Sequence, residues 1–224
     1  GIMEPNLSLA LGSGQFTPLN MCEAYSAFAR GGTSIKPRFI ENVVSPWGEQ
    51  LYSSTPETRE AMSPETAYVV TSLLQQVVQE GTGARAKSLG RPVAGKTGTT
   101  IDVQDAWFMG FSPYLLTGVW VGYDQVKPMG KFETGARAAL PIWIDYRAKV
   151  EPKYPVENFT VPPGIVMARV DARTGRLAGP DAAEAYMLPF ANGTEPTLTA
   201  MPDEFDAAPG SSNAGGESLL KQIF

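Results

Sequence analysis

The sequence contains no histidine and only one cysteine among its 224 residues. The absence of histidine excludes a Ser-His-Asp triad, a Cys-His pair and nearly every zinc site from this chain. Cys22 has no partner for an internal disulfide, and its place on a helical apolar face indicates a small core residue rather than a nucleophile. We therefore expect neither a metal nor a cofactor. Any catalysis must use lysine, serine, threonine, tyrosine or carboxylate groups.

Basic residues and long apolar runs are also scarce. The 18 Lys and Arg residues are outnumbered by 23 Asp and Glu residues, so a nucleic-acid partner is not expected. No apolar run approaches the roughly 20 residues of a membrane-spanning helix, and no signal peptide opens the sequence. The opening residues 1–5 (GIMEP) resemble neither a leader nor a natural start, so we expect a piece of a longer protein.

Three helices are predicted from their end signals and apolar spacing. Thr17 and Pro18 suit the N-cap and first position of a helix that ends at Gly31-Gly32. Ser63 and Pro64 begin a second helix, which runs to Glu80. A third helix has Pro141 in its first turn, and its predicted inward residues are Ile142, Trp143, Tyr146 and Val150.

The strand signals predict two antiparallel units. Residues 39–44 and 50–53 flank a turn and read as a hairpin. Residues 93–101, 106–111 and 115–123 read as three consecutive antiparallel strands, and the last two are apolar on both faces. Such a sheet must be covered on both faces, most simply by helices. The expected fold class is therefore α/β of the α+β type, with an antiparallel sheet between helices.

Composition changes after the third helix. Residues 152–163 contain four prolines and read as a linker, and residues 165–171 and 176–178 suggest a final hairpin. The remainder is rich in Gly, Ala, Ser, Pro and acidic residues without periodicity, which indicates disorder. We expect a main domain over residues 1–150, a linker and hairpin extension over 151–201, and a disordered tail over 202–224.

Residues 90–100 (GRPVAGKTGTT) fit two unrelated motifs. Gly90 to Thr97 match the phosphate-binding pattern G-x-x-x-x-G-K-[ST], whereas Lys96-Thr97-Gly98-Thr99 form a K-T-G-T run. A phosphate loop requires a buried strand before the first glycine and a helix that begins at the Lys-Thr. The segment upstream is a mixed polar loop, and the β-branched residues downstream favour a strand. A nucleotide hydrolase remains the alternative, to be decided by the structure that follows Lys96.

Other segments agree with the K-T-G interpretation. They are residues 93–100, 105–111 and 118–124 around the motif, residues 8–12, 17–19 and 24–25 before it, and residues 161–166 after it. Together these segments resemble the transpeptidase domain of class A penicillin-binding proteins, over about residues 5 to 196. The resemblance implies the penicillin-binding-protein and β-lactamase type of fold. It also implies a location on the outer face of the cytoplasmic membrane, in a protein that is membrane-anchored as a whole.

Enzymes of this family cross-link peptidoglycan without histidine. A serine attacks the D-Ala-D-Ala peptide of one stem, the last D-Ala leaves, and an amine of a second stem takes the acyl group; β-lactams trap the serine. The resemblance assigns Lys96 as a positive charge and proton partner beside that serine. It assigns the Thr97 and Thr99 hydroxyls to a substrate carboxylate, and the Thr99 N–H to the oxyanion. Gly98 lets the substrate backbone lie flat against the strand.

Two family motifs are missing from their expected place. A Ser-x-x-Lys and a Ser-x-Asn should precede Lys96, but the 95 residues before it contain neither. The tail segments 211–213 and 218–221 match both patterns in reversed order, in a stretch too glycine-rich to hold a serine rigidly. We therefore expect the C-terminal part of a transpeptidase, inactive by itself and completed by a missing N-terminal part. A non-catalytic remnant or binding module is the remaining alternative.

Two further pairs could have chemical roles. Asp102 and Asp105 flank the loop after the motif, where turn formation and capping are favoured over acid–base chemistry. Trp107 and Trp120 could form a ligand platform, but on alternating apolar strands they are interpreted as core residues.

Overall fold

The computed structural model describes residues 14–180 and 182–201. Its helices are α1 (Pro18–Ala29), α2 (Pro64–Gln79) and α3 (Leu140–Val150), with short helical turns η2 (Ala84–Leu89), η3 (Ile101–Val103), η4 (Gly135–Ala139) and η5 (Glu151–Lys153). The predicted disorder over 202–224, the serine motifs of the tail and the family segment at residues 8–12 lie outside the described residues.

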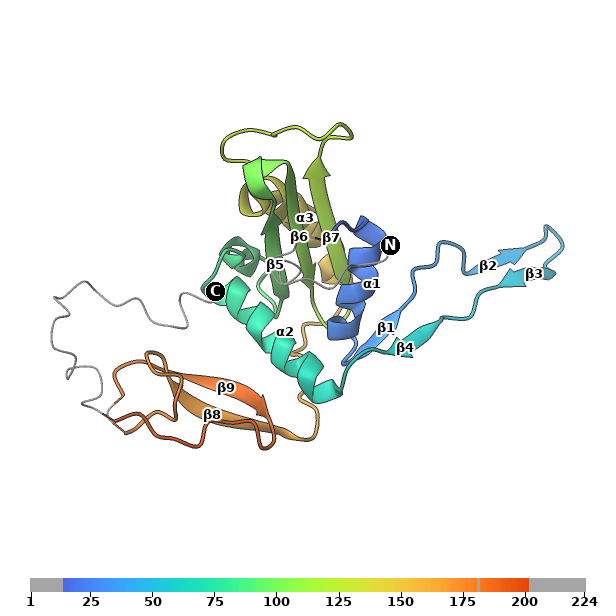
Figure 1. The fold of residues 1–224 in the computed structure, drawn as a ribbon. Coiled ribbons are helices and arrows are strands. Elements are labelled where there is room, and N and C mark those ends of the chain that lie inside the picture. The colour runs from blue at the N-terminus through green and yellow to red at the C-terminus, as the bar shows by residue number, and fades with distance from the viewer. Residues whose placement is uncertain (1–13, 181, 202–224) are drawn as a thin grey trace.

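The central sheet contains β5 (Ala94–Thr99), β6 (Asp105–Phe111) and β7 (Leu116–Gly122) in the order β5-β6-β7 (Figure 1). Both pairings are antiparallel, so the predicted three-stranded unit is confirmed. The register places Lys96 of β5 opposite Met109 of β6, and Met109 opposite Gly118 of β7. This row of three residues fixes which side chains share a face of the sheet.

Helices cover both faces of this sheet, as predicted. On one face α3 places Trp143 against Phe108, with ring centroids 5.0 Å apart. On the opposite face α1 places the Cys22 sulfur beside Gly118, where a Cβ atom would lie 3.2 Å from it. We call these the α3 face and the α1 face. Burial raises the pKa of the Cys22 thiol, which agrees with the interpretation of a packing residue rather than a nucleophile.

The first two helices begin where the sequence indicated. The Thr17 side chain accepts a hydrogen bond from the Asn20 N–H, and the Asn20 Oδ1 atom accepts one from the Thr17 N–H, which completes a capping box. Ser63 caps α2 by accepting from the Thr66 N–H. α2 then contacts β5 on one side and the C-terminal hairpin on the other, so its end is held beside the K-T-G strand (Figure 1).

The buried stripe of α3 differs from the prediction. Of the residues predicted to point inward, Trp143 is buried, but Ile142 and Tyr146 are about half exposed. Leu140 and Arg147 are buried in their place. The helix follows directly from the π-helical turn η4, and its buried stripe is completed by the charged Arg147, which apolar periodicity cannot detect.

A long two-stranded ribbon projects from the body between α1 and α2 (Figure 1). Its base pairs β1 (Thr33–Ile35) with β4 (Thr58–Glu60), and its outer half pairs β2 (Asn42–Val44) with β3 (Gln50–Ser53). The predicted hairpin is therefore confirmed, with a shorter first strand. Trp47 in its turn is 90% exposed.

The C-terminal hairpin contains a strand beyond those predicted. β8 (Ile165–Asp171) pairs along its whole length with β9 (Ala185–Ala191), whereas the predicted partner 176–178 contributes one isolated bridge between Val170 and Leu177. The Asp171 carboxylate accepts hydrogen bonds from the backbone of residues 173 and 174 and forms a tight turn. The chain therefore reverses after β8 as predicted, and the Asp171 and Ala178 N–H groups donate to the carbonyls of Arg176 and Arg169 over 2.8 Å. β9 pairs with the other edge of β8 and forms the full ladder.

Candidate active site

The K-T-G-T residues lie in the second half of β5, at the edge of the central sheet. Side chains alternate along a strand, so Lys96 and Gly98 lie on the α1 face and the two threonines on the α3 face. A strand, not a helix, contains the Lys-Thr step, and the short 3₁₀ helix η2 precedes it in place of a buried strand. Neither half of the phosphate-loop context is present, so the nucleotide alternative is wrong.

The direction of the backbone groups follows from one hydrogen bond. The Thr100 N–H donates to the Asp105 carbonyl across the ladder, over 3.1 Å. Successive residues of an antiparallel strand point their N–H and C=O groups to opposite sides. Gly98 therefore directs its backbone groups toward β6. Thr97 and Thr99 direct theirs to the other edge of β5, which we call the free edge because no strand of residues 14–180 and 182–201 pairs with it. An unpaired edge of this kind can pair with an extended peptide.

Lys96 contributes a cation to the same edge. Its Nζ atom donates to the Thr97 carbonyl over 3.1 Å, so the ammonium group is turned toward the free edge. The side chain is exposed, but neighbouring atoms displace part of its hydration, and this desolvation lowers the pKa of Lys96. A lysine with a lowered pKa at an open strand edge can serve as an electrostatic or proton-transfer group.

The two threonine hydroxyls each have a defined partner. The Thr97 Oγ1 atom lies 2.7 Å from the Thr82 Oγ1 atom, and Thr99 Oγ1 accepts a hydrogen bond from the Gly135 N–H over 3.1 Å. Sequence reasoning did not single out Thr82, which lies 15 positions before its partner. The glycines on both sides, Gly81 and Gly83, were the signal that could have drawn attention to it.

Gly98 and Gly135 pack backbone against backbone. A Cβ atom on Gly135 would lie 2.4 Å from the Trp107 carbonyl oxygen and 2.6 Å from the Gly98 carbonyl oxygen. Only glycine permits this approach, which lets η4 brace the K-T-G strand from the α3 face. A Cβ atom on Gly98 would meet Trp107 at 3.2 Å, on the α1 face.

The aspartate and tryptophan pairs have mainly structural contacts. Asp105 accepts a hydrogen bond from the Trp120 indole N–H over 2.7 Å, and Asp102 has a positive φ of 62° in the loop that leaves β5. The position of Asp102 agrees with turn formation, whereas the Asp105 carboxylate makes a contact between β6 and β7. Trp107 is half-buried, but Trp120 is 36% exposed, so its interpretation as a core residue is wrong for this chain.

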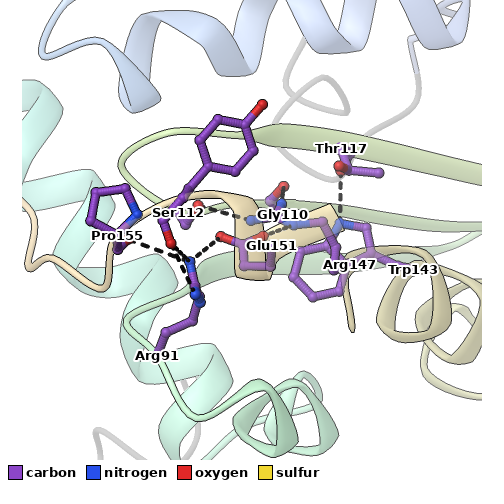
Figure 2. A network of polar contacts seen from close by, with 9 residues as sticks. Arg91, Gly110, Ser112, Thr117, Trp143, Arg147, Glu151 and Pro155 are labelled. Atoms are coloured by element: carbon purple, nitrogen blue, oxygen red, sulfur yellow. Dashed lines mark hydrogen bonds and ion pairs between the residues drawn. The ribbon is translucent and has the colours of Figure 1, made fainter. Parts of the chain in front are cut away.

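A buried charge network holds the segment before β5 against the end of α3 (Figure 2). Arg147, which is fully buried, donates to the carboxylate of Glu151 and to Ser112 Oγ. Arg91, three residues before β5, donates to the other Glu151 oxygen over 3.2 Å and to the carbonyls of residues 154 and 155. The predicted linker is thus bound to the body at its start.

Two opposing effects act on the pKa of the Glu151 carboxylate. Burial raises the pKa of Glu151, but the hydrogen bonds from Arg147 and Ser112 and the two guanidinium charges outweigh it. The net pKa lies below the ordinary value of a glutamate. The network therefore holds an ionised carboxylate between two cations.

Other features of the described residues add no second reaction centre. A cavity of about 340 Å³ lies between α1, α2 and residues 159–162, and none of its lining residues belongs to the K-T-G-T run. Within residues 14–180 and 182–201, no three His, Cys, Asp or Glu side chains are grouped so as to hold a metal ion. No helix in this part of the chain is long and apolar enough to cross a membrane.

Known proteins resemble the chain over most of its length. Penicillin-binding protein 1A of Aquifex aeolicus is 47% identical over 197 residues, which are 88% of this chain and 27% of the relative. Penicillin-binding protein 1A of Pseudomonas aeruginosa is 36% identical over 88% of this chain and 30% of its own length. The crystal structure of penicillin-binding protein 1A from Haemophilus influenzae superposes with a TM-score of 0.80 at 30% identity, over 87% of this chain and 34% of that one.

These matches assign the chain to a family, but they cover only part of each relative. The chain spans less than a third of the length of the two curated relatives. Its residues 3–140 match the family model for the penicillin-binding protein transpeptidase domain. The β5 edge and its K-T-G-T residues lie within that match. The chain therefore belongs to the penicillin-binding protein transpeptidase family.

Proposed function

We propose that this chain is the C-terminal part of a D,D-transpeptidase that cross-links peptidoglycan through an acyl-enzyme. A serine outside this chain attacks the carbonyl of the D-Ala-D-Ala peptide, and the terminal D-Ala leaves with a proton on its amine. The amine of a second stem peptide then attacks the ester, loses a proton and regenerates the serine hydroxyl. β-Lactams acylate the same serine and are not released rapidly.

The residues of β5 have separate roles in this proposal. Lys96 supplies positive charge beside the serine and exchanges a proton with the reacting groups. The Thr97 and Thr99 hydroxyls bind the terminal carboxylate of the donor stem, and Gly98 leaves room for the peptide backbone. The Thr99 N–H donates to the oxyanion that develops on the attacked carbonyl.

The free edge of β5 is the single observation that carries this proposal. It brings together the Lys96 ammonium group and the outward N–H of Thr99, both on a strand open to an extended peptide. Family membership supports the reaction type. The chain supplies no Ser-x-x-Lys before Lys96, so we propose that the isolated chain is not acylated. The alternative, that the protein is a non-catalytic binding module, is tested by the labelling experiment below.

The proposed partners are stem peptides, β-lactams and the remaining part of the same protein. By the same argument, the protein works at the outer face of the cytoplasmic membrane, where peptidoglycan is assembled. We divide the chain into a transpeptidase portion over residues 1–150, an extension over 151–201 and a tail over 202–224. The partners and the location rest on the family, and the division of the chain rests on the composition of its sequence.

Covalent labelling with a fluorescent penicillin tests the function directly. The complete protein should be labelled, and unlabelled penicillin should block the label. Lys96→Ala should slow acylation by about 100-fold or more, because it removes the charged proton partner. Lys87→Ala is the matched control, since the Lys87 ammonium group also donates to a backbone carbonyl, that of Gln79, but not on β5. Labelling of Lys96→Ala at the normal rate would refute the role of Lys96, and an unlabelled complete protein would indicate a non-catalytic module.

A further inference from the structure

The loop between α2 and η2 places one hydroxyl against the K-T-G strand. Both Gly81 and Gly83 donate their N–H groups to the Val77 carbonyl over 3.1 Å, so the loop is tied to the last turn of α2. Gly83 is buried, and a Cβ atom there would lie 3.2 Å from the same carbonyl oxygen and 3.6 Å from Phe108. Thr82 between the two glycines is therefore held in a fixed position although its side chain is exposed.

Which hydroxyl donates in the hydrogen bond between Thr82 and Thr97 depends on the ligand that Thr97 binds. Its Oγ1 atom lies 2.7 Å from the Thr97 Oγ1 atom, and either hydroxyl could donate. A hydroxyl carries one proton, so Thr97 can donate either to Thr82 or to a ligand. An ionised carboxylate only accepts hydrogen bonds. When Thr97 donates to a carboxylate, Thr82 must therefore be the donor to Thr97.

We propose that Thr82 is a positioning residue, whose hydroxyl donates to Thr97 Oγ1 and so directs the Thr97 proton at the terminal carboxylate of the donor stem peptide. This inference rests on the proposed function and adds a residue to it. When Thr97 donates to a charged carboxylate, its oxygen becomes a better acceptor, so the hydrogen bond from Thr82 to Thr97 is strengthened as well. The effect belongs to anionic ligands, since an ester presents no charge to the Thr97 proton.

The test compares two probes on the complete protein. Benzylpenicillin carries a free carboxylate, whereas its methyl ester does not. Thr82→Val keeps the shape of the side chain and removes the hydroxyl, and Thr82→Ser restores a hydroxyl. Thr66→Val is the matched control, because Thr66 Oγ1 also pairs with a hydroxyl, that of Ser63 at 3.1 Å, at the opposite end of α2.

For benzylpenicillin, Thr82→Val should lower the second-order acylation rate constant by about tenfold, as expected for one oriented hydrogen bond to an anion. For the methyl ester, the change should stay within about twofold, and Thr82→Ser and Thr66→Val should stay within the same range for both probes.

Two results would overturn the inference. An unchanged rate for Thr82→Val with benzylpenicillin would show that the Thr82 hydroxyl is not used. An equal loss with both probes would assign Thr82 a purely structural role. Absence of acylation in the unmodified protein is a separate result, which would refute the proposed function and the inference that rests on it.

Discussion

Replacement of Glu151 by glutamine tests how much the buried charge network contributes to stability. The substitution keeps the side-chain volume and one acceptor oxygen, so the main change is loss of charge. Glu151 is 2% exposed, and it is the carboxylate between the fully buried Arg147 and the nearly buried Arg91. Without it, two guanidinium groups remain together in a region that excludes water.

The magnitude follows from comparable buried ion pairs. Removal of one partner of a buried pair typically costs about 3–5 kcal/mol, because a buried charge is left uncompensated. We expect the Glu151→Gln variant to lose a free energy of unfolding in this range. Glu41→Gln is the matched control. It breaks the exposed Arg38–Glu41 pair, whose N–O distance is 3.0 Å, and should cost less than about 1 kcal/mol.

Urea unfolding followed by tryptophan fluorescence is the measurement. Trp143 is a suitable reporter, because the Arg147 guanidinium lies 4.7 Å from the centroid of its ring. The difference between the two proteins should also depend on pH. The folded-state pKa of Glu151 lies below that of the unfolded chain, so its stabilisation is complete above the unfolded value of about 4.3 and declines as the pH falls through the folded value.

The difference in free energy of unfolding between the original protein and the Glu151→Gln variant should therefore be largest near neutral pH and should decrease in acid. A loss below about 1 kcal/mol at pH 7, equal to that of Glu41→Gln, would refute the reasoning. A difference independent of pH would show that the loss comes from the acceptor oxygen that the amide N–H₂ group replaces, rather than from the charge of the carboxylate.

Three further predictions concern backbone packing, helix capping and the ribbon. Gly135→Ala should lower the free energy of unfolding by about 1–3 kcal/mol, because the added methyl group meets backbone oxygens of Gly98 and Trp107; urea unfolding measures this, and an unchanged midpoint would contradict it. Thr17→Ala should cost about 1 kcal/mol in the same assay through loss of the N-cap, with Thr17→Ser as the conservative control. Trp47→Ser should change stability by less than about 0.5 kcal/mol, since the ring is 90% exposed; a larger loss would mean that the ribbon packs against the protein.

Local signals in the sequence predicted much of this fold. The Thr17-Pro18 and Ser63-Pro64 steps give the starts of α1 and α2, because caps depend only on neighbouring residues. The turn at residues 45–48 and the apolar, aromatic and β-branched content of β6 and β7 are equally local. By contrast, β1 and β4 have three residues each and pair across 25 positions, which no short pattern reveals. The pairing of β8 with β9 across about 14 to 26 positions has the same cause.

Charged and polar contacts were the other features that could not be predicted from the sequence. Arg147 and Glu151 are four positions apart, a spacing typical of a solvated helix surface, yet both are buried. Lys96 and its neighbours could be placed on a strand from β-branched content, because the motif and the strand share the same residues. Thr82 could not, since its contact with Thr97 exists only after α2 has packed beside β5.

The isolated position of the ribbon has a practical consequence for labelling chemistry. Cys22 is the only thiol in this chain, and burial raises its pKa, so we expect it to react more slowly with maleimides at neutral pH than an exposed thiol. A Trp47→Cys substitution would add an exposed thiol with an ordinary reactivity at the tip of the ribbon. A dye attached there would report on the orientation of this domain by energy transfer, without touching the edge of β5.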